Sequence, residues 1–133
     1  MPIKTGAIEL LQWLQDEKWR VALATSTGRE STMHHLESAQ MTQYFDQIIT
    51  GEQVQHGKPD PEIYAKACAA IGACPATTYA VEDSPNGIRS AAAAGLRVIM
   101  VPDLVPVSAE QMPFLTSVQP DLLEVMQWLK QSV

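Results

Sequence analysis

The sequence predicts a doubly wound, Rossmann-like α/β domain built on a parallel sheet. Apolar residues alternate between helical and strand spacing along the whole chain, and the strand-like runs have no polar face of their own. Such strands are buried on both sides, which is typical of parallel sheets covered by helices on both faces. With 133 residues the chain is about one domain long, so residues 1–133 are expected to form a single unit.

The first half of the chain predicts helix, strand, helix, strand. Ala7, Leu10 and Leu14 repeat at helical spacing, and a weaker second helix has Met33 and Leu36 on its inner side. We expect helices over about 6–17 and 29–40, and strands over 19–24 and 45–49.

The second half continues the alternation. Asp60 and Pro61 suit the N-cap and first position of a helix that Gly72 ends. Four of the nine prolines fall between 102 and 120, which indicates a long irregular connection. We expect helices over about 61–71, 84–94 and 122–129, and strands over 78–81 and 96–101.

Composition excludes several classes of protein. With 46% hydrophobic and 18% charged residues, the chain is not intrinsically disordered. The formal charge of −6 repels phosphate backbones and anionic lipid, so we expect neither nucleic acid nor a membrane as partner. Cys68 and Cys74 have no zinc or redox spacing, which favours a reducing, cytoplasmic location.

Two of three polar clusters follow predicted strand ends, where parallel sheets bind ligands, and the one at residues 57–60 precedes a predicted helix. Thr25, Ser26 and Thr27 offer hydroxyls and backbone N–H groups at a helix start, which suits an anion or an ordinary N-cap. Lys58 could neutralise a phosphoryl group from the same edge, or be a solvated surface lysine.

The third cluster is the adjacent pair Glu82 and Asp83, directly after a buried strand. Two neighbouring carboxylates suit Mg²⁺, which keeps waters and substrate phosphate in its shell. The alternative is a solvated turn in which Asp83 or Ser84 caps the next helix.

Together the clusters are the parts that phosphoryl transfer needs, apart from a nucleophile. A phosphoenzyme route would use an aspartate at another strand end. Asp16 and Asp46 lie in or beside helices and Asp103 follows the last predicted strand, so none is well placed for attack.

Three segments resemble motifs of the haloacid dehalogenase-like (HAD) superfamily. Val21–Thr27, Gly57–Tyr64 and Val81–Gly87 are similar to its second, third and fourth motifs, and residues 93–99 fit the helix and strand that follow. The resemblance is closest to the β-phosphoglucomutase and sugar-phosphate phosphatase branch.

The resemblance implies a role for each candidate residue. Thr25 would hydrogen-bond the transferring phosphoryl group, assisted by the backbone N–H of Ser26, and Lys58 would balance negative charge on nucleophile and phosphate. Glu82 and Asp83 would hold Mg²⁺. The implied substrate is a small phosphorylated metabolite, such as a sugar phosphate, hydrolysed through an aspartyl-phosphate.

The sequence also departs from the family pattern. Family members begin with a strand that ends in an Asp-x-Asp pair, followed by a helical cap, and neither is found here. We therefore expect a C-terminal part of such an enzyme, inactive by itself. A phosphomutase of the β-phosphoglucomutase type and a non-catalytic scaffold are the alternatives.

The absent strand has a structural consequence. In the family it lies between the strands expected here at 19–24 and 78–81, so both would keep an unpaired hydrophobic edge. We expect the isolated chain to form a homodimer, exchange elements, or close the gap by shifting a strand.

Overall fold

A computed structural model describes residues 4–102 and 108–132, and helices and strands alternate along them as expected. Asp103 therefore lies outside the described residues. The α-helices are α1 (Ala7–Asp16), α2 (Arg29–Ser38), α3 (Glu62–Ala70), α4 (Pro85–Ala93) and α5 (Leu122–Ser132). The strands are β1 (Ala22–Ala24), β2 (Gln47–Ile49), β3 (Tyr79–Glu82), β4 (Arg97–Met100) and β5 (Leu115–Val118). None of the described helices is long and apolar enough to cross a membrane.

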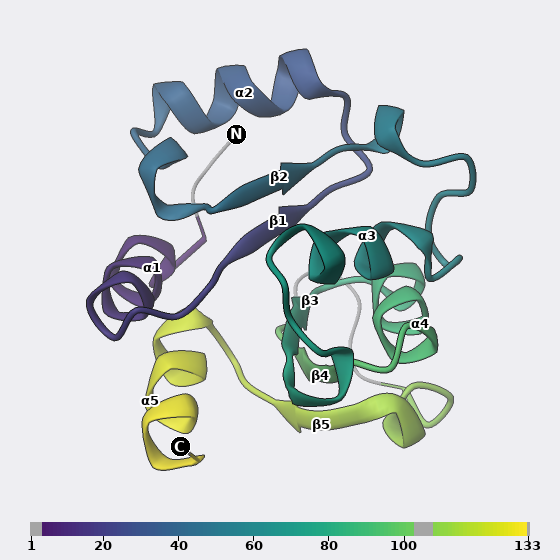
Figure 1. Ribbon diagram of the computed structural model, residues 1–133. Helices are drawn as coiled ribbons and strands as arrows, with labels where there is room; N and C mark the ends of the chain where they lie inside the picture. The colour runs from purple at the N-terminus through teal and green to yellow at the C-terminus, as the bar shows by residue number, and fades with distance from the viewer. Residues whose placement is uncertain (1–3, 103–107, 133) are drawn as a thin grey trace.

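Every strand pair is parallel, which confirms the predicted doubly wound α/β class. β1 pairs with β2, in register from Ala22 opposite Gln47 to Ala24 opposite Ile49. β4 pairs with β3 on one side and with β5 on the other. The described strands thus belong to two sheets, β1–β2 and β3–β4–β5 (Figure 1). Among the described residues no strand lies between β1 and β3.

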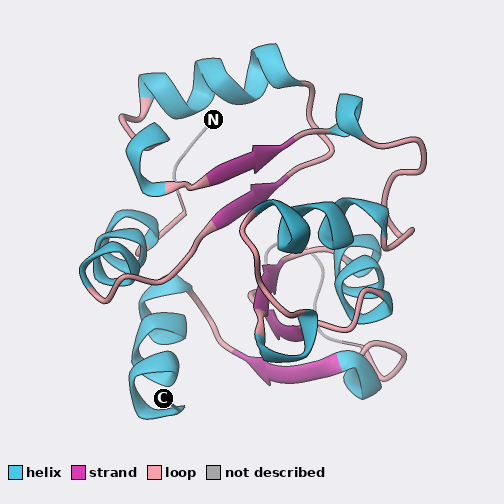
Figure 2. Ribbon diagram, viewed as in Figure 1, coloured by secondary structure: helices cyan, strands magenta, loops and turns pink. Residues whose placement is uncertain are grey.

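Helices cover both faces of these strands (Figure 2). On one face α3 and α4 contribute the buried residues Ile63, Ala67 and Ile88 to a cluster with Val98 and Met100 of β4. On the other face α1 and α5 pack side by side over Ile99 and contribute buried leucines and Val125. Because Ala22 and Ala24 pack against the first cluster and Val21 against the second, both sheets share the same two cores.

Local residues set several helix ends, including the one expected at Gly72. The hydroxyl of Ser84 accepts a hydrogen bond from the N–H of Gly87 at 3.1 Å and caps α4. Gly72 and Gly95 follow α3 and α4 with φ of +66° and +92°, a backbone region that favours glycine. Local sequence therefore fixes where these helices end.

One prediction about elements was wrong. The end of the expected irregular connection forms β5, which escapes the sequence pattern because it is short, contains Thr116 and Ser117, and lies between prolines. An edge strand needs no continuous apolar run. The predicted start of α3 is confirmed to within one residue: the helix spans Glu62–Ala70, Pro61 before it has helical dihedral angles, and the Asp60 carboxylate accepts a hydrogen bond from the Glu62 N–H at 2.9 Å.

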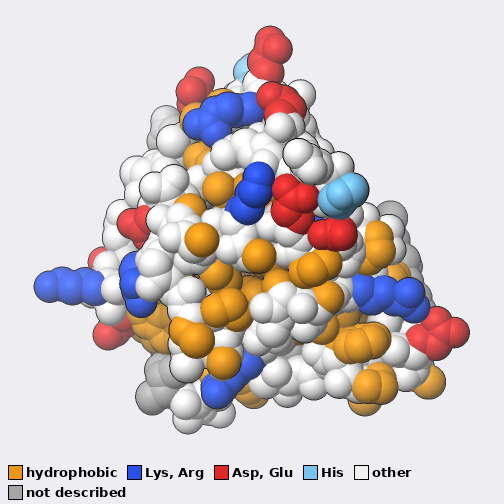
Figure 3. Space-filling view, turned by 45° about the vertical axis from the view of Figure 1, so that its right-hand side comes forward, with side chains coloured by type: hydrophobic (Ala, Val, Ile, Leu, Met, Phe, Trp, Pro, Cys, Tyr) orange, Lys and Arg blue, Asp and Glu red, His pale blue; other side chains and the backbone are white. Residues whose placement is uncertain are grey.

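Figure 3 shows one face of the molecule. Acidic and basic side chains are interspersed over its upper part, and hydrophobic side chains are spread over its centre and lower part. The described residues on this face form no large patch of positive charge.

Candidate functional site

Lys58 joins the carboxyl ends of β1 and β3. Its Nζ lies 2.7 Å from Oε2 of Glu82, the last residue of β3, and 3.3 Å from the carbonyl oxygen of Ala24, the last residue of β1. The side chain is mostly buried, with an exposed fraction of 14%. An ammonium group is thus held at the strand edge where the sequence predicted a cation.

Glu82 is enclosed on three sides. Its Oε2 accepts hydrogen bonds from both Lys58 and the Tyr64 hydroxyl, and its Oε1 lies against Gly87 so closely that a Cβ there would collide with it. A buried carboxylate is stable only when charge and hydrogen bonds satisfy it. Lys58 supplies the charge, and Tyr64 supplies a second donor.

Tyr64 remains a hydrogen-bond donor because its phenol does not ionise easily. Burial, followed by the neighbouring negative charge of Glu82, holds the pKa of Tyr64 far above its ordinary value. The Lys58 ammonium also lies 5.2 Å from the centre of the Tyr64 ring, within the range of a cation–π interaction. Lys58, Tyr64 and Glu82 therefore form one connected group.

Thr25 and Ser26 follow β1 at the same edge. The Thr25 hydroxyl accepts a hydrogen bond from the N–H of Thr27 at 3.2 Å, and the Thr25 N–H donates to the Ile49 carbonyl of β2 at 3.0 Å. The carbonyl of Ser26 lies so close to Gly51 that a Cβ would not fit there. The turn is thus fixed, and Thr25 directly follows the residue whose carbonyl Lys58 contacts.

Asp83 differs from its neighbour Glu82 in burial and partner. Its Oδ2 forms an ion pair with Lys4 Nζ at 3.0 Å, and its side chain is 40% exposed, against 7% for Glu82. Successive side chains in an extended segment point to opposite faces, so one acid enters the core and the other reaches the surface.

Asp83 fits a magnesium site better than Glu82 does. Mg²⁺ takes carboxylate oxygens and usually keeps several waters, which the exposed Asp83 allows. On Glu82 only Oε1 remains, because Oε2 already accepts hydrogen bonds from two donors. Residues 4–102 and 108–132 contain no group of three or more acidic, histidine or cysteine residues able to hold a metal. The donor set within this part of the chain is therefore partial.

The loop that carries Lys58 is anchored by Glu62. The Glu62 carboxylate accepts hydrogen bonds from the backbone N–H groups of Gln55 and His56 at 3.0 Å each, and pairs with Lys66 at 3.3 Å. The Gln55 bond is the main reason that the pKa of Glu62 is lowered from its ordinary value. Glu62 therefore helps to place Lys58 from α3.

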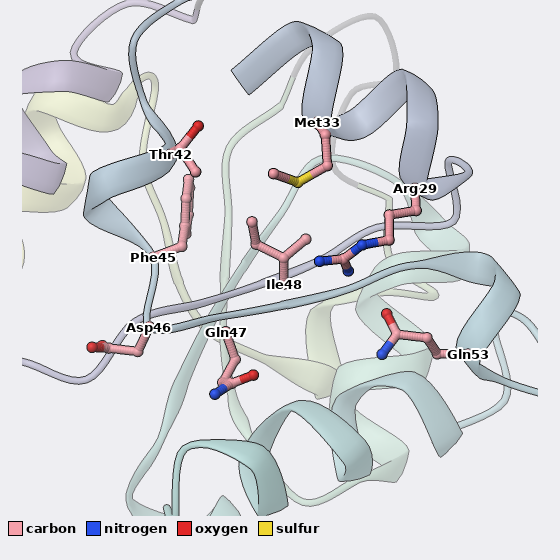
Figure 4. A pocket seen from close by; sticks show the side chains of 8 residues that line it. All are labelled: Arg29, Met33, Thr42, Phe45, Asp46, Gln47, Ile48 and Gln53. Atoms are coloured by element: carbon pink, nitrogen blue, oxygen red, sulfur yellow. The ribbon is translucent and has the colours of Figure 1, made fainter. Parts of the chain in front are cut away.

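A cavity of about 430 Å³ lies elsewhere, between α2 and β2 (Figure 4). Arg29 and Met33 extend from α2 toward Ile48 of β2. Its other lining residues are Thr42, Phe45, Asp46, Gln47 and Gln53. None of the five residues predicted to bind phosphate or metal lines this cavity, so it is separate from the candidate site.

The structure places all five predicted residues after or beside the ends of β1 and β3. It brings Lys58 into contact with Glu82 and beside the turn that begins at Thr25, whereas Asp83 pairs with Lys4. Their roles in binding phosphate and metal stay predictions. Sequence reasoning missed Tyr64 and Gly87 as parts of the site. The available signal was a glycine in the first turn of a predicted helix, where it does not end the helix, because such a glycine often allows another group to approach the backbone closely.

Known relatives support the motif resemblance. The chain is 35% identical over 94 residues to the phosphorylated carbohydrates phosphatase of Thermotoga maritima, covering 71% of this chain and 44% of the relative. It is 38% identical over 91 residues to the validoxylamine A 7′-phosphate phosphatase of Streptomyces hygroscopicus subsp. limoneus, covering 68% and 43%. The chain thus spans less than half the length of these relatives.

Solved structures share the fold. A Thermotoga maritima protein provisionally assigned as a β-phosphoglucomutase superimposes with a TM-score of 0.88 and 27% identity, over 97% of this chain and 60% of the other. CbbY from Rhodobacter sphaeroides, solved in complex with phosphate, superimposes with a TM-score of 0.82 and 27% identity, over 92% and 55%. Residues 2–101, about three-quarters of the chain, match the sequence pattern of the haloacid dehalogenase-like hydrolases, and the chain belongs to that family.

Proposed function

We propose that this chain forms the supporting part of the active site of a Mg²⁺-dependent phosphatase that acts on a small phosphorylated metabolite of the sugar-phosphate class. One observation carries the proposal: Lys58 bridges the ends of β1 and β3, next to the Thr25 turn and in contact with Glu82, which directly precedes Asp83. The named activities of the phosphatase relatives support the choice of substrate.

Each residue has a defined task in the proposed reaction. The Thr25 hydroxyl and the Ser26 N–H donate hydrogen bonds to the transferring phosphoryl group, and Lys58 offsets the negative charge that gathers there. Glu82 fixes Lys58 from the protein side. Asp83 would hold Mg²⁺, with Glu82 contributing at most its remaining Oε1, and the ion would neutralise charge on the phosphoryl oxygens when bound.

The nucleophile of the proposed reaction comes from outside the described residues. Phosphoryl transfer through an aspartyl-phosphate needs a carboxylate in line with the phosphorus atom. Asp16 closes α1 and Asp46 precedes β2, where its carboxylate accepts the Val21 N–H at 2.8 Å. We therefore propose that the 133-residue chain by itself binds phosphate but does not hydrolyse phosphate esters.

The first test separates binding from turnover. The chain with Mg²⁺ is titrated with inorganic phosphate by NMR and assayed with p-nitrophenyl phosphate. We expect saturable shifts at the Thr25 turn without turnover. Thr25→Val and Lys58→Met should each weaken phosphate binding about tenfold or more, since a hydrogen bond to a charged group contributes roughly 1.5–3 kcal/mol.

Thr27→Val is the matched control, because it removes an exposed hydroxyl from the same turn without removing a predicted ligand. Phosphate binding that resists both Thr25→Val and Lys58→Met would refute the proposed site and favour a non-catalytic scaffold. Turnover by the chain alone, if abolished by Asp83→Asn, would refute the proposed inactivity.

A phosphomutase is the second candidate function. The likeness to the Thermotoga maritima protein provisionally assigned as a β-phosphoglucomutase favours it. Both reactions use the same phosphoryl-binding groups, so the distinction lies in the acceptor. A longer protein that contains this chain would, as a mutase, move phosphate within a sugar phosphate without releasing inorganic phosphate, which a product analysis by ³¹P NMR would detect.

A further inference from the structure

The hydroxyl of Tyr64, in the first turn of α3, donates a hydrogen bond to the carboxylate of Glu82. We propose that Tyr64 is a positioning residue: it commits Glu82 to holding Lys58 and so keeps the Lys58 ammonium able to bind a phosphoryl group. The inference rests on the proposed function, since it concerns how strongly the same site binds phosphate and Mg²⁺.

Packing alone does not explain a hydroxyl at this position. The buried face of α3 otherwise consists of the apolar side chains of Ile63, Ala67 and Cys68. A phenylalanine would fill the same space, and a buried hydroxyl costs free energy unless it forms a hydrogen bond. Tyr64 is 7% exposed, and its hydroxyl donates to Oε2 of Glu82. The role of the hydroxyl is therefore to be sought at this carboxylate.

Tyr64 and Lys58 share one oxygen of Glu82. Lys58 Nζ lies 2.7 Å from Oε2, the same atom that accepts the hydrogen bond from Tyr64. A hydrogen bond to a carboxylate stabilises its negative charge. The Tyr64 hydroxyl therefore reduces the charge that Lys58 alone must balance, and the ammonium is held in place without being fully neutralised.

Lys58 keeps one donor for a phosphoryl oxygen. An ammonium group has three N–H donors. Among the residues that the structure describes, two groups accept from it: Glu82 Oε2 at 2.7 Å and the Ala24 carbonyl at 3.3 Å. The Tyr64 ring, whose centre is 5.2 Å from Nζ, supports the ammonium without using a donor. The third N–H is thus available to an anion beside the turn that begins at Thr25.

The same hydroxyl makes Glu82 a poor ligand for Mg²⁺. Both donors occupy Oε2, and Oε1 lies against Gly87. Without the Tyr64 hydroxyl the buried charge of Glu82 would be less well balanced. Its carboxylate would then attract a divalent cation more strongly, since carboxylate oxygens are the ligands that Mg²⁺ prefers. Tyr64 therefore favours phosphate at Lys58 over metal at Glu82.

The test is Tyr64→Phe, which removes the hydroxyl and keeps the ring beside Lys58. Inorganic phosphate and Mg²⁺ are titrated separately into the 133-residue chain and followed by NMR. We expect phosphate affinity to fall about threefold or more and Mg²⁺ affinity to rise about threefold or more, because a hydrogen bond to a charged group is lost. A purely structural role of Tyr64 would lower both affinities or change neither, and either result would overturn the proposal.

Two further variants test the route of the effect. Glu82→Gln keeps an acceptor for Tyr64 but removes the charge that holds Lys58, so in this background Tyr64→Phe should change phosphate affinity less than about twofold. A full effect there would overturn the proposal. Tyr79→Phe is the matched control, because it removes a hydroxyl from the first residue of the strand that ends at Glu82. It should leave both affinities unchanged, and an effect equal to that of Tyr64→Phe would also overturn the proposal.

Lys58→Met, titrated in parallel, separates this inference from the proposed function. If Lys58→Met weakens phosphate binding and Tyr64→Phe does not, only the role of Tyr64 is refuted. If the wild-type chain binds no phosphate, or binds it equally well after Lys58→Met, the proposed use of Lys58 and the role of Tyr64 are both refuted. A Tyr64→Phe chain that loses its folded amide spectrum would show that Tyr64 is structural and overturn the inference.

Discussion

Strand β4 and strand β1 show two ways of holding a strand in this molecule. Val98, Ile99 and Met100 of β4 have no exposed surface, because strands pair on both sides and helices cover both faces. No residue of β1 is fully buried. Side chains connect the region of β1 to β3 at both ends, through Lys58 at one end and through Trp19, which precedes β1, at the other. The three-stranded sheet is held by strand pairing and packing, whereas the two sheets are joined by the two shared cores and by a few polar and aromatic contacts without strand pairing among the described residues.

The largest effect is expected where packing dominates. Ile99→Ala should lower the free energy of unfolding by about 2–5 kcal/mol, because it leaves a cavity in a core with no access to water. Leu23→Ala in β1 removes a partly exposed side chain and should cost less than half of that. Urea denaturation measures both. Equal losses would mean that β1 is as tightly packed as β4.

A smaller effect is expected at the contact between the two sheets, where Lys58 meets Glu82. Gly87→Ala brings a Cβ against the Glu82 carboxylate and displaces it from Lys58 and Tyr64. We expect a net loss of about 1–2 kcal/mol, since overpacking costs roughly 1–3 kcal/mol and alanine recovers up to about 1 kcal/mol of helix propensity.

Gly57→Ala is the control for this change, because nothing lies within 4 Å of a Cβ at that position. Its effect should stay within about 0.5 kcal/mol. A Gly87→Ala protein that keeps full stability and an unchanged Lys58 ammonium signal by NMR would show that Gly87 does not hold the Glu82 carboxylate in place.

The smallest effect concerns pH. The folded pKa of Glu62 is lowered, chiefly by the Gln55 N–H, so its stabilisation is present above the ordinary value of 4.5 and is lost as pH falls through the folded value. Glu62→Gln should therefore lower stability at neutral pH and make no difference in acid. Chemical denaturation across pH 3–7 checks this, with Glu124→Gln, also in the first turn of a helix, as control. A difference that does not vary with pH would contradict it.

The sequence predicted the helices and four strands because their signals are local. Ser84, Gly72 and Gly95 act within one turn of the helix that they cap or end. The apolar run at 96–101 is sufficient to identify β4 without knowledge of its partner strands. β5 was missed because its residues become a strand only by pairing with β4. Thr25, Ser26, Glu82 and Asp83 were found at strand ends, since parallel topology brings those ends to one edge, while Lys58 was found in the loop before a predicted helix.

The sequence by itself determined the α/β class, the helix ends and the edge at which Thr25, Lys58, Glu82 and Asp83 would gather. Only the tertiary structure decided that Glu82 is enclosed by Lys58, Tyr64 and Gly87 while Asp83 pairs with Lys4 at the surface. Caps and periodicity act between residues close in the chain. Burial and pairing of a carboxylate depend instead on groups that are distant in the chain and meet only after folding.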